Sequence, residues 1–221
     1  GSATSWITKK IVKNHGEEYI SLTCHTFPRI KNEFKDRTEF SLSCACPEVI
    51  EIINSIDGKI DMICEEGNHS LDSSLEFKIR ETLVNIIKQD EFSLDHKLVI
   101  SFQMLLTILE NIHINQRKLL TEVEEYKDKE YLKELEHMYN KIDLNRDESI
   151  EEINNLFIDI VENYRDVSGL ETILDDISSF AEEIEIEYLC EQWNDYKKVF
   201  KEYSDFIENC IVSKILANCN S

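Results

Sequence analysis

Residues 189–210, LCEQWNDYKKVFKEYSDFIENC, carry the most regular apolar pattern in the chain. The apolar positions alternate between spacings of four and three, which is the heptad pattern of an amphipathic helix. This pattern predicts a bundle helix that packs an aromatic-rich side on the core. The alternative is an exposed seam for a partner helix or a second copy of the chain. The residues at these positions are Leu189, Trp193, Tyr196, Phe200, Tyr203, Ile207 and Cys210.

The sequence around this stretch contains almost no helix breakers. The 221 residues include five glycines and two prolines, and residues 68–221 include only Gly169. Gly and Pro make up about 3% of the chain, against roughly 12% on average. Barrels and sandwiches need these residues at their many turns, so we exclude them. We predict an all-α fold, either a multi-helix bundle or an irregular stack of helical hairpins, with its body at residues 68–221.

Apolar spacing divides this body into helices. We predict helices at residues 73–88, 149–164 and 170–186, besides the one at 189–210. The first has Asp72 or Ser73 as its cap. Residues 94–142 form one long helix, or two that are separated near 113–116 or near 127–130. The expected apolar side of this segment is Leu98, Phe102, Leu105, Leu109, Ile112, Leu119, Val123 and Tyr126, followed by Leu132, Leu135, Tyr139 and Ile142.

Residues 1–67 differ in composition from the rest of the chain, because they contain both prolines, four glycines and four cysteines. We predict a small, less regular N-terminal segment that packs on the body, so that the whole chain forms one structural domain. A short helix is expected at residues 6–14. Alternating apolar and polar residues at 19–24 and 39–44 predict a short β-hairpin. A further helix is expected to start at Pro47, since proline favours the first helical turn.

The chain carries 45 acidic residues against 24 basic ones, a formal net charge of −21. This charge argues against direct binding to nucleic acid or an anionic membrane. Residues 143–191 hold sixteen acids against two arginines, a net charge of −14. The ordinary interpretation is a solvated, solubilising face, and the alternative, which we take as a candidate site, is an acidic helical face that docks a basic segment of another protein. The candidate residues are Asp175, Asp176, Glu182, Glu183, Glu185 and Glu187.

Residues 143–154 resemble an EF-hand calcium loop. The matching positions are Asp143, Asn145, Asp147 and Ser149. Glu148 replaces the glycine of the sharp turn, and Asn154 replaces the bidentate glutamate at the end of the loop. A calcium site is therefore one alternative, and the other is an interhelix loop in which Asp143 or Asp147 caps the next helix.

The chain has seven cysteines, an odd number at low density, which favours free thiols and an intracellular protein of the cytoplasm or nucleus. A structural zinc site in the N-terminal segment is an alternative, although only one C-x-C pair occurs. The third alternative is a secreted or surface-exposed helical binding domain of a parasite or virus, with a disulfide from Cys24 to Cys44 or Cys46. The candidate zinc ligands are Cys24, His25, Cys44, Cys46, Cys64 and His69.

The sequence shows no G-x-S-x-G, P-loop, G-x-G-x-x-G or H-E-x-x-H motif. No apolar run reaches the roughly 18 residues of a membrane span. We therefore predict a non-catalytic protein–protein interaction module, a scaffold or adaptor without a cofactor. Its contact is either the acidic face or the aromatic seam, since aromatic residues often anchor interfaces. The seam residues are Trp193, Tyr196, Phe200 and Tyr203.

Overall fold

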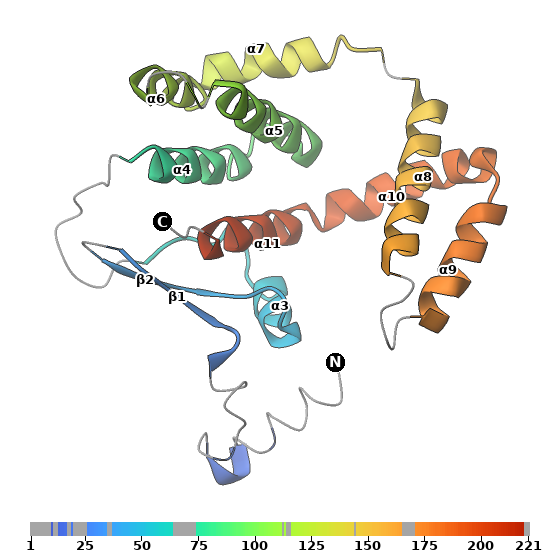
Figure 1. Cartoon of the computed structure of the whole chain (residues 1–221), viewed down its shortest axis with the longest axis horizontal. Coiled ribbons are helices and arrows are strands. Elements are labelled where there is room, and N and C mark those ends of the chain that lie inside the picture. Colours follow the sequence, from blue (N-terminus) through green and yellow to red (C-terminus); the bar gives the residue numbers. More distant parts are fainter. Residues whose placement is uncertain are drawn as a thin grey trace. The chain divides into compact units, whose positions relative to one another are not determined.

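A computed structural model describes residues 10, 13–16, 19, 26–34, 37–63, 74–111, 113, 116–143, 145–164 and 171–218. The described chain is mainly helical and carries one two-stranded hairpin near the N-terminus (Figure 1). The predicted all-α class with a short β-hairpin is therefore confirmed. No described helix has both the length and the apolar character that crossing a bilayer requires.

The chain divides into two compact units. Unit 1 comprises Gly1–Tyr139 together with Ser204–Ser221, and unit 2 comprises Asn140–Tyr203. The chain thus leaves unit 1 after Tyr139 and returns to it at Ser204. The boundary that we expect at residues 67 and 68 stays a prediction, because residues 64–73 lie outside the described ranges.

The hairpin of unit 1 pairs β1 (Arg29–Glu33) with β2 (Thr38–Leu42) in antiparallel register. The expected strand at 39–44 overlaps β2, and the partner that the described residues show is β1; residues 20–24 of the expected strand at 19–24 lie outside the description. Residues 34–37 connect the two strands, and the Phe34 N–H donates to the Arg37 carbonyl at 2.8 Å. Such a short connection costs little closure entropy. β1 shows no apolar alternation, so its sequence gave no strand signal. The short helix expected at 6–14 lies mostly outside the described residues.

Helix α11 (Ser204–Ala217) is the element on which the hairpin and α3 (Pro47–Asn54) pack. Helix α3 starts at Pro47, as predicted, after Cys46 as N-cap. The buried Asn209 side chain donates to the Gly58 carbonyl at 2.8 Å and accepts from the Ile60 N–H at 2.9 Å. These bonds satisfy a buried amide and fix the chain after α3 against α11.

Four further helices build the core of unit 1: α4 (Leu75–Ile87), α5 (Leu94–Asn111), α6 (Gln116–Glu125) and α7 (Lys129–Tyr139). Helix α4 begins after Ser74, so the cap lies one residue beyond the expected Ser73. The segment 94–142 is interrupted at both expected places rather than at one. The buried core residues are Ile86, Phe92, Ile100, Met104, Ile108, Val123, Tyr126, Leu132 and Leu135.

The buried side of α5 differs from the expected one. Ile100 and Met104 are fully buried, whereas Phe102 is 65% exposed and Leu109 is 62% exposed. Apolar residues occupy almost every side of this helix, so spacing alone could not select a face. Packing against α4, α6 and α7 selects it. Downstream, the expected Leu119, Val123 and Tyr126 are buried as predicted.

Unit 2 consists of α8 (Arg146–Tyr164), α9 (Glu171–Glu183) and α10 (Ile186–Glu202), with α8 packed against both others. The single helix expected at 189–210 is wrong, because α10 ends at Glu202 and α11 begins at Ser204. Tyr203 interrupts the helix with φ −100° and ψ 13°. The interruption falls where the chain passes from unit 2 to unit 1, and the sequence marks it with neither glycine nor proline.

Candidate functional site

Three aromatic side chains stack along one side of α10 in unit 2, and we call them the aromatic ladder: Trp193, Tyr196 and Phe200. The first two rings have centroids 5.6 Å apart and an interplanar angle of 23°, and the last two are 5.7 Å apart at 29°. Tyr196 is 55% exposed, and the other two are half-buried. The structure therefore brings together three of the four predicted seam residues. The fourth, Tyr203, lies at the helix end and is 47% exposed.

The ladder already holds a cation from its own helix. The ammonium of Lys197 lies 5.6 Å from the ring centroid of Trp193. An ammonium at this distance is attracted by the negative face of an aromatic ring. The next residue, Lys198, instead pairs with the Asp195 carboxylate at 2.9 Å. The partly exposed rings of the ladder are therefore suited to bind cationic groups and apolar side chains.

The predicted acidic residues lie on the helix pair α9–α10. Asp175 and Asp176 are exposed on α9. Glu182 belongs to the same helix, but its side chain lies outside the described part of the structure. The chain then turns into α10 through exposed acids that we call the acidic turn: Glu183, Glu185 and Glu187. The acidic turn and the aromatic ladder thus belong to the same pair of helices, and α10 contributes to both.

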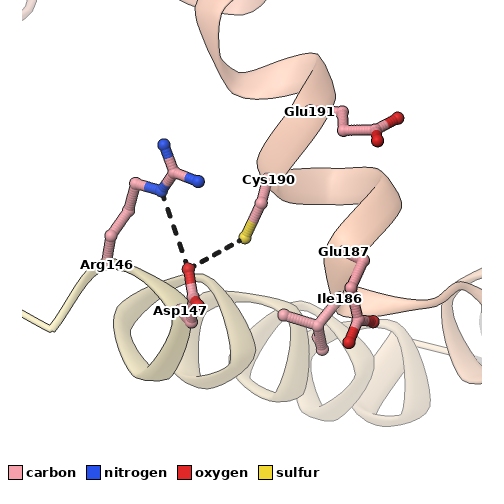
Figure 2. A pocket seen from close by; sticks show the side chains of 6 residues that line it. All are labelled: Arg146, Asp147, Ile186, Glu187, Cys190 and Glu191. Carbon is pink, nitrogen blue, oxygen red and sulfur yellow. Dashed lines mark hydrogen bonds and ion pairs between the residues drawn. The ribbon is translucent and has the colours of Figure 1, made fainter.

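A cavity of about 490 Å³ lies between the first turns of α8 and α10 (Figure 2). The Cys190 thiol donates to the Asp147 carboxylate, with Sγ 3.2 Å from Oδ1, and Arg146 Nε lies 3.7 Å from the same oxygen. Loss of solvation and the Asp147 carboxylate raise the pKa of the Cys190 thiol, so the thiol stays protonated at neutral pH. This arrangement is a structural contact rather than an activated nucleophile. The other lining residues are Ile186, Glu187 and Glu191.

The sequence by itself does not mark Cys190 as a site residue. The residues around it on α10 show helical spacing but no motif of a functional site, and Asp147 is 43 residues away in the chain. Only the packing of α8 against α10 brings the two side chains together.

The EF-hand-like segment is helical over most of its length, because α8 begins at Arg146. Asn145, rather than the expected Asp143 or Asp147, caps this helix: its side-chain oxygen accepts from the Glu148 N–H at 3.4 Å. In the part of the chain that is described, no three His, Cys, Asp or Glu side chains gather in a way suited to a metal. Calcium binding therefore stays a prediction that this geometry does not support.

The expected zinc ligands Cys24, His25, Cys64 and His69 lie outside the described residues. The remaining two, Cys44 and Cys46, are free thiols in the described chain. The zinc hypothesis thus stays a prediction.

Comparison with known proteins gives one family. The family model of the FliB lysine N-methylase C-terminal domain matches residues 80–220. No curated protein and no solved structure matches the chain. The matched residues run from α4 through α11 and include all of unit 2, with both the aromatic ladder and the acidic turn. The chain therefore belongs to the family of FliB lysine N-methylase C-terminal domains.

Proposed function

We propose that this chain is the substrate-docking part of a lysine N-methylase and that it contributes binding rather than chemistry. In this proposal the aromatic ladder and the acidic turn of unit 2 hold a lysine-bearing segment of the protein substrate. The observation that carries the proposal is the partly exposed, stacked ladder on α10, where the ammonium of Lys197 lies over the Trp193 ring. The family name supplies the chemistry of the partner, a protein lysine.

Charge and aromatic faces act on such a partner in different ways. Carboxylates attract a lysine-rich segment over a distance of about 10 Å at 0.1 M salt, which speeds encounter more than it strengthens the complex. An aromatic face then holds an ammonium with about 0.5–1 kcal/mol at an exposed site. Lysine methylation keeps the positive charge, so substrate and product would both fit. The expected complex is weak, salt-sensitive and short-lived.

The test measures fluorescence anisotropy of a labelled synthetic peptide that contains four lysines, with a peptide that carries glutamates in their place as the reference. We expect the lysine peptide alone to bind, and more weakly as salt is raised. Replacing Tyr196 by Ala should weaken binding several-fold at every salt concentration. Reversing Glu183, Glu185 and Glu187 to Lys should slow association and remove most of the salt dependence.

Lys197 offers a sharper comparison. If the ladder binds lysine, Lys197 competes for the Trp193 ring, so Lys197→Ala should raise the affinity for the peptide. Lys198→Ala removes the same charge from the neighbouring position, but this side chain pairs with Asp195 and not with the ladder. It should therefore raise the affinity less. Equal effects of the two variants, or unchanged binding by Tyr196→Ala, would count against the ladder as the site.

A further inference from the structure

Two cysteines of unit 1 lie against each other across a packing contact. Cys44 belongs to the turn between β2 and α3, and Cys210 belongs to α11. The Cys44 thiol donates to the Cys210 carbonyl, with Sγ 3.8 Å from the oxygen. On the same side of the helix, the Ser213 hydroxyl donates to the Leu42 carbonyl at 3.1 Å. Residues 42–44 therefore run alongside one turn of α11.

The Cys44 thiol also affects the titration of Cys210. Burial and the neighbouring Cys44 thiol raise the pKa of Cys210 to about 11. Both cysteines are free and partly buried. A thiol with this pKa is almost wholly protonated at neutral pH and is a poor first nucleophile. The two side chains lie close enough that a mixed disulfide formed at one cysteine can be attacked by the other.

We infer that Cys44 and Cys210 form a reversible redox modification site that closes to a disulfide with a small disulfide oxidant, such as oxidised glutathione. In the first step the Cys44 sulfur attacks the glutathione disulfide, which yields a mixed disulfide and one reduced glutathione. In the second step the Cys210 sulfur attacks the Cys44 sulfur of the mixed disulfide and releases a second glutathione. Two protein thiols are oxidised, one glutathione disulfide is reduced, and the two thiol protons end on the released glutathione molecules.

Because of where the two cysteines lie in the chain, a disulfide between them would constrain the return of the chain to unit 1. Unit 2 lies between the two cysteines in sequence, and α11 is the segment by which the chain returns to unit 1. A bond from Cys44 to Cys210 spans 166 residues and fastens this returning helix covalently to the hairpin side of unit 1. Crosslinks that close long loops restrict the unfolded chain most. Oxidation should therefore hold α11 in place, independently of any docking by unit 2.

The experiment incubates the folded protein with oxidised glutathione, blocks the remaining thiols with N-ethylmaleimide and maps the digested peptides by mass spectrometry. We expect a linked peptide pair through Cys44 and Cys210 that disappears on reduction with dithiothreitol. The oxidised protein should melt about 5–15 °C higher than the reduced protein. The melting temperature is measured with the small oxidant removed.

Matched variants decide the assignment. Cys46→Ser removes a thiol two residues from Cys44 and should leave the linked pair and the rise in melting temperature intact. Cys210→Ser and Cys44→Ser should each abolish both. Linkage of Cys44 to Cys46, a bond between two protein molecules, or separate labels on Cys44 and Cys210 would each overturn the inference.

Discussion

The carboxylate of Glu39 on β2 accepts two parallel hydrogen bonds from the guanidinium of Arg80 on α4, Nη1 to Oε2 at 2.6 Å and Nη2 to Oε1 at 2.9 Å. Arg37 adds a third bond from Nε to Oε1 at 2.7 Å. Both guanidinium groups also lie over the ring of Phe77, 4.2 Å away for Arg37 and 4.6 Å for Arg80. The Arg80 side chain is only 8% exposed, so this cluster connects the hairpin with the helical core through a largely desolvated charge pair.

Glu39→Gln removes the negative charge between two guanidinium groups and should lower the free energy of unfolding by roughly 2–3 kcal/mol. Urea denaturation followed by circular dichroism measures the change. Glu33→Gln on β1 is the control, because the Glu33 side chain is 68% exposed and pairs with the exposed Lys31. Its effect should stay below about 0.5 kcal/mol, and equal losses in both variants would contradict the assignment.

The same pair predicts a pH dependence. Burial tends to raise the pKa of Glu39, but the hydrogen bonds from Arg80 and Arg37 outweigh it and hold this pKa below the ordinary 4.5. A folded-state pKa below the unfolded one stabilises the protein above the unfolded pKa, and this contribution is lost as pH falls through the folded pKa. The stability difference between the wild type and Glu39→Gln should thus be constant near neutral pH and shrink below pH 4.5. Denaturation series at several pH values measure it, and a difference that persists in acid would refute this origin.

A buried ion pair fastens α11 to α5. Lys97 Nζ lies 2.6 Å from Glu208 Oε1, and the two side chains are 3% and 5% exposed. Lys97→Met should destabilise the protein by roughly 2–4 kcal/mol, because among the described residues Glu208 then keeps one cationic partner, Lys59, at the longer distance of 3.4 Å. Adding Glu208→Gln to this variant should recover part of the loss. Lys198→Met, at the exposed pair with Asp195, is the control and should cost less than about 1 kcal/mol.

The buried face of α5 can be tested with two substitutions. Met104 is fully buried, so Met104→Ala should lower the free energy of unfolding by about 2–5 kcal/mol. Phe102 is 65% exposed, so Phe102→Ser should change it by no more than about 0.5 kcal/mol. Chemical denaturation of both variants measures the contrast. A larger loss of stability from Phe102→Ser than from Met104→Ala would instead support the buried face that the sequence spacing predicts.

The start of α8 gives a test of the calcium hypothesis. Asn145→Ala removes the cap and should destabilise unit 2 by about 1 kcal/mol, whereas Asn145→Asp should retain most of the stability. Asn155→Ala, at an exposed position within α8, is the matched control. We expect added calcium to leave the melting temperature unchanged. A calcium-dependent rise that Asp143→Ala abolishes would instead establish a metal site.

Some features were predictable because their signals are local. Pro47 marked the start of α3, and the apolar spacing of Leu119, Val123 and Tyr126 identified a truly buried face. Strand β1 could not be found in this way, since it is defined by its hydrogen bonds to β2 and its own residues show no apolar alternation. The end of α10 at Glu202 could not be predicted either, because no glycine or proline marks the point where the chain passes from unit 2 to unit 1.

The candidate site was predictable in its residue types but not in its arrangement. The aromatic spacing on one helix already placed Trp193, Tyr196 and Phe200 on a common side, because residues three and four apart are neighbours on a helix surface. Only the structure shows how exposed these side chains are. It also shows that the Lys197 ammonium lies over the Trp193 ring. The contact between Cys190 and Asp147 depends on the packing of two helices that are far apart in the sequence.

The sequence by itself determined that the chain is helical, because helix formation depends on local spacing and on the absence of glycine and proline over 68–221. It also determined where the negative charge is concentrated. The tertiary structure alone decided which side of α5 is buried and which distant groups meet, such as Lys97 with Glu208 and Cys44 with Cys210. The physical reason is that burial and ion pairing are set by contacts between elements, which the spacing within one element does not encode.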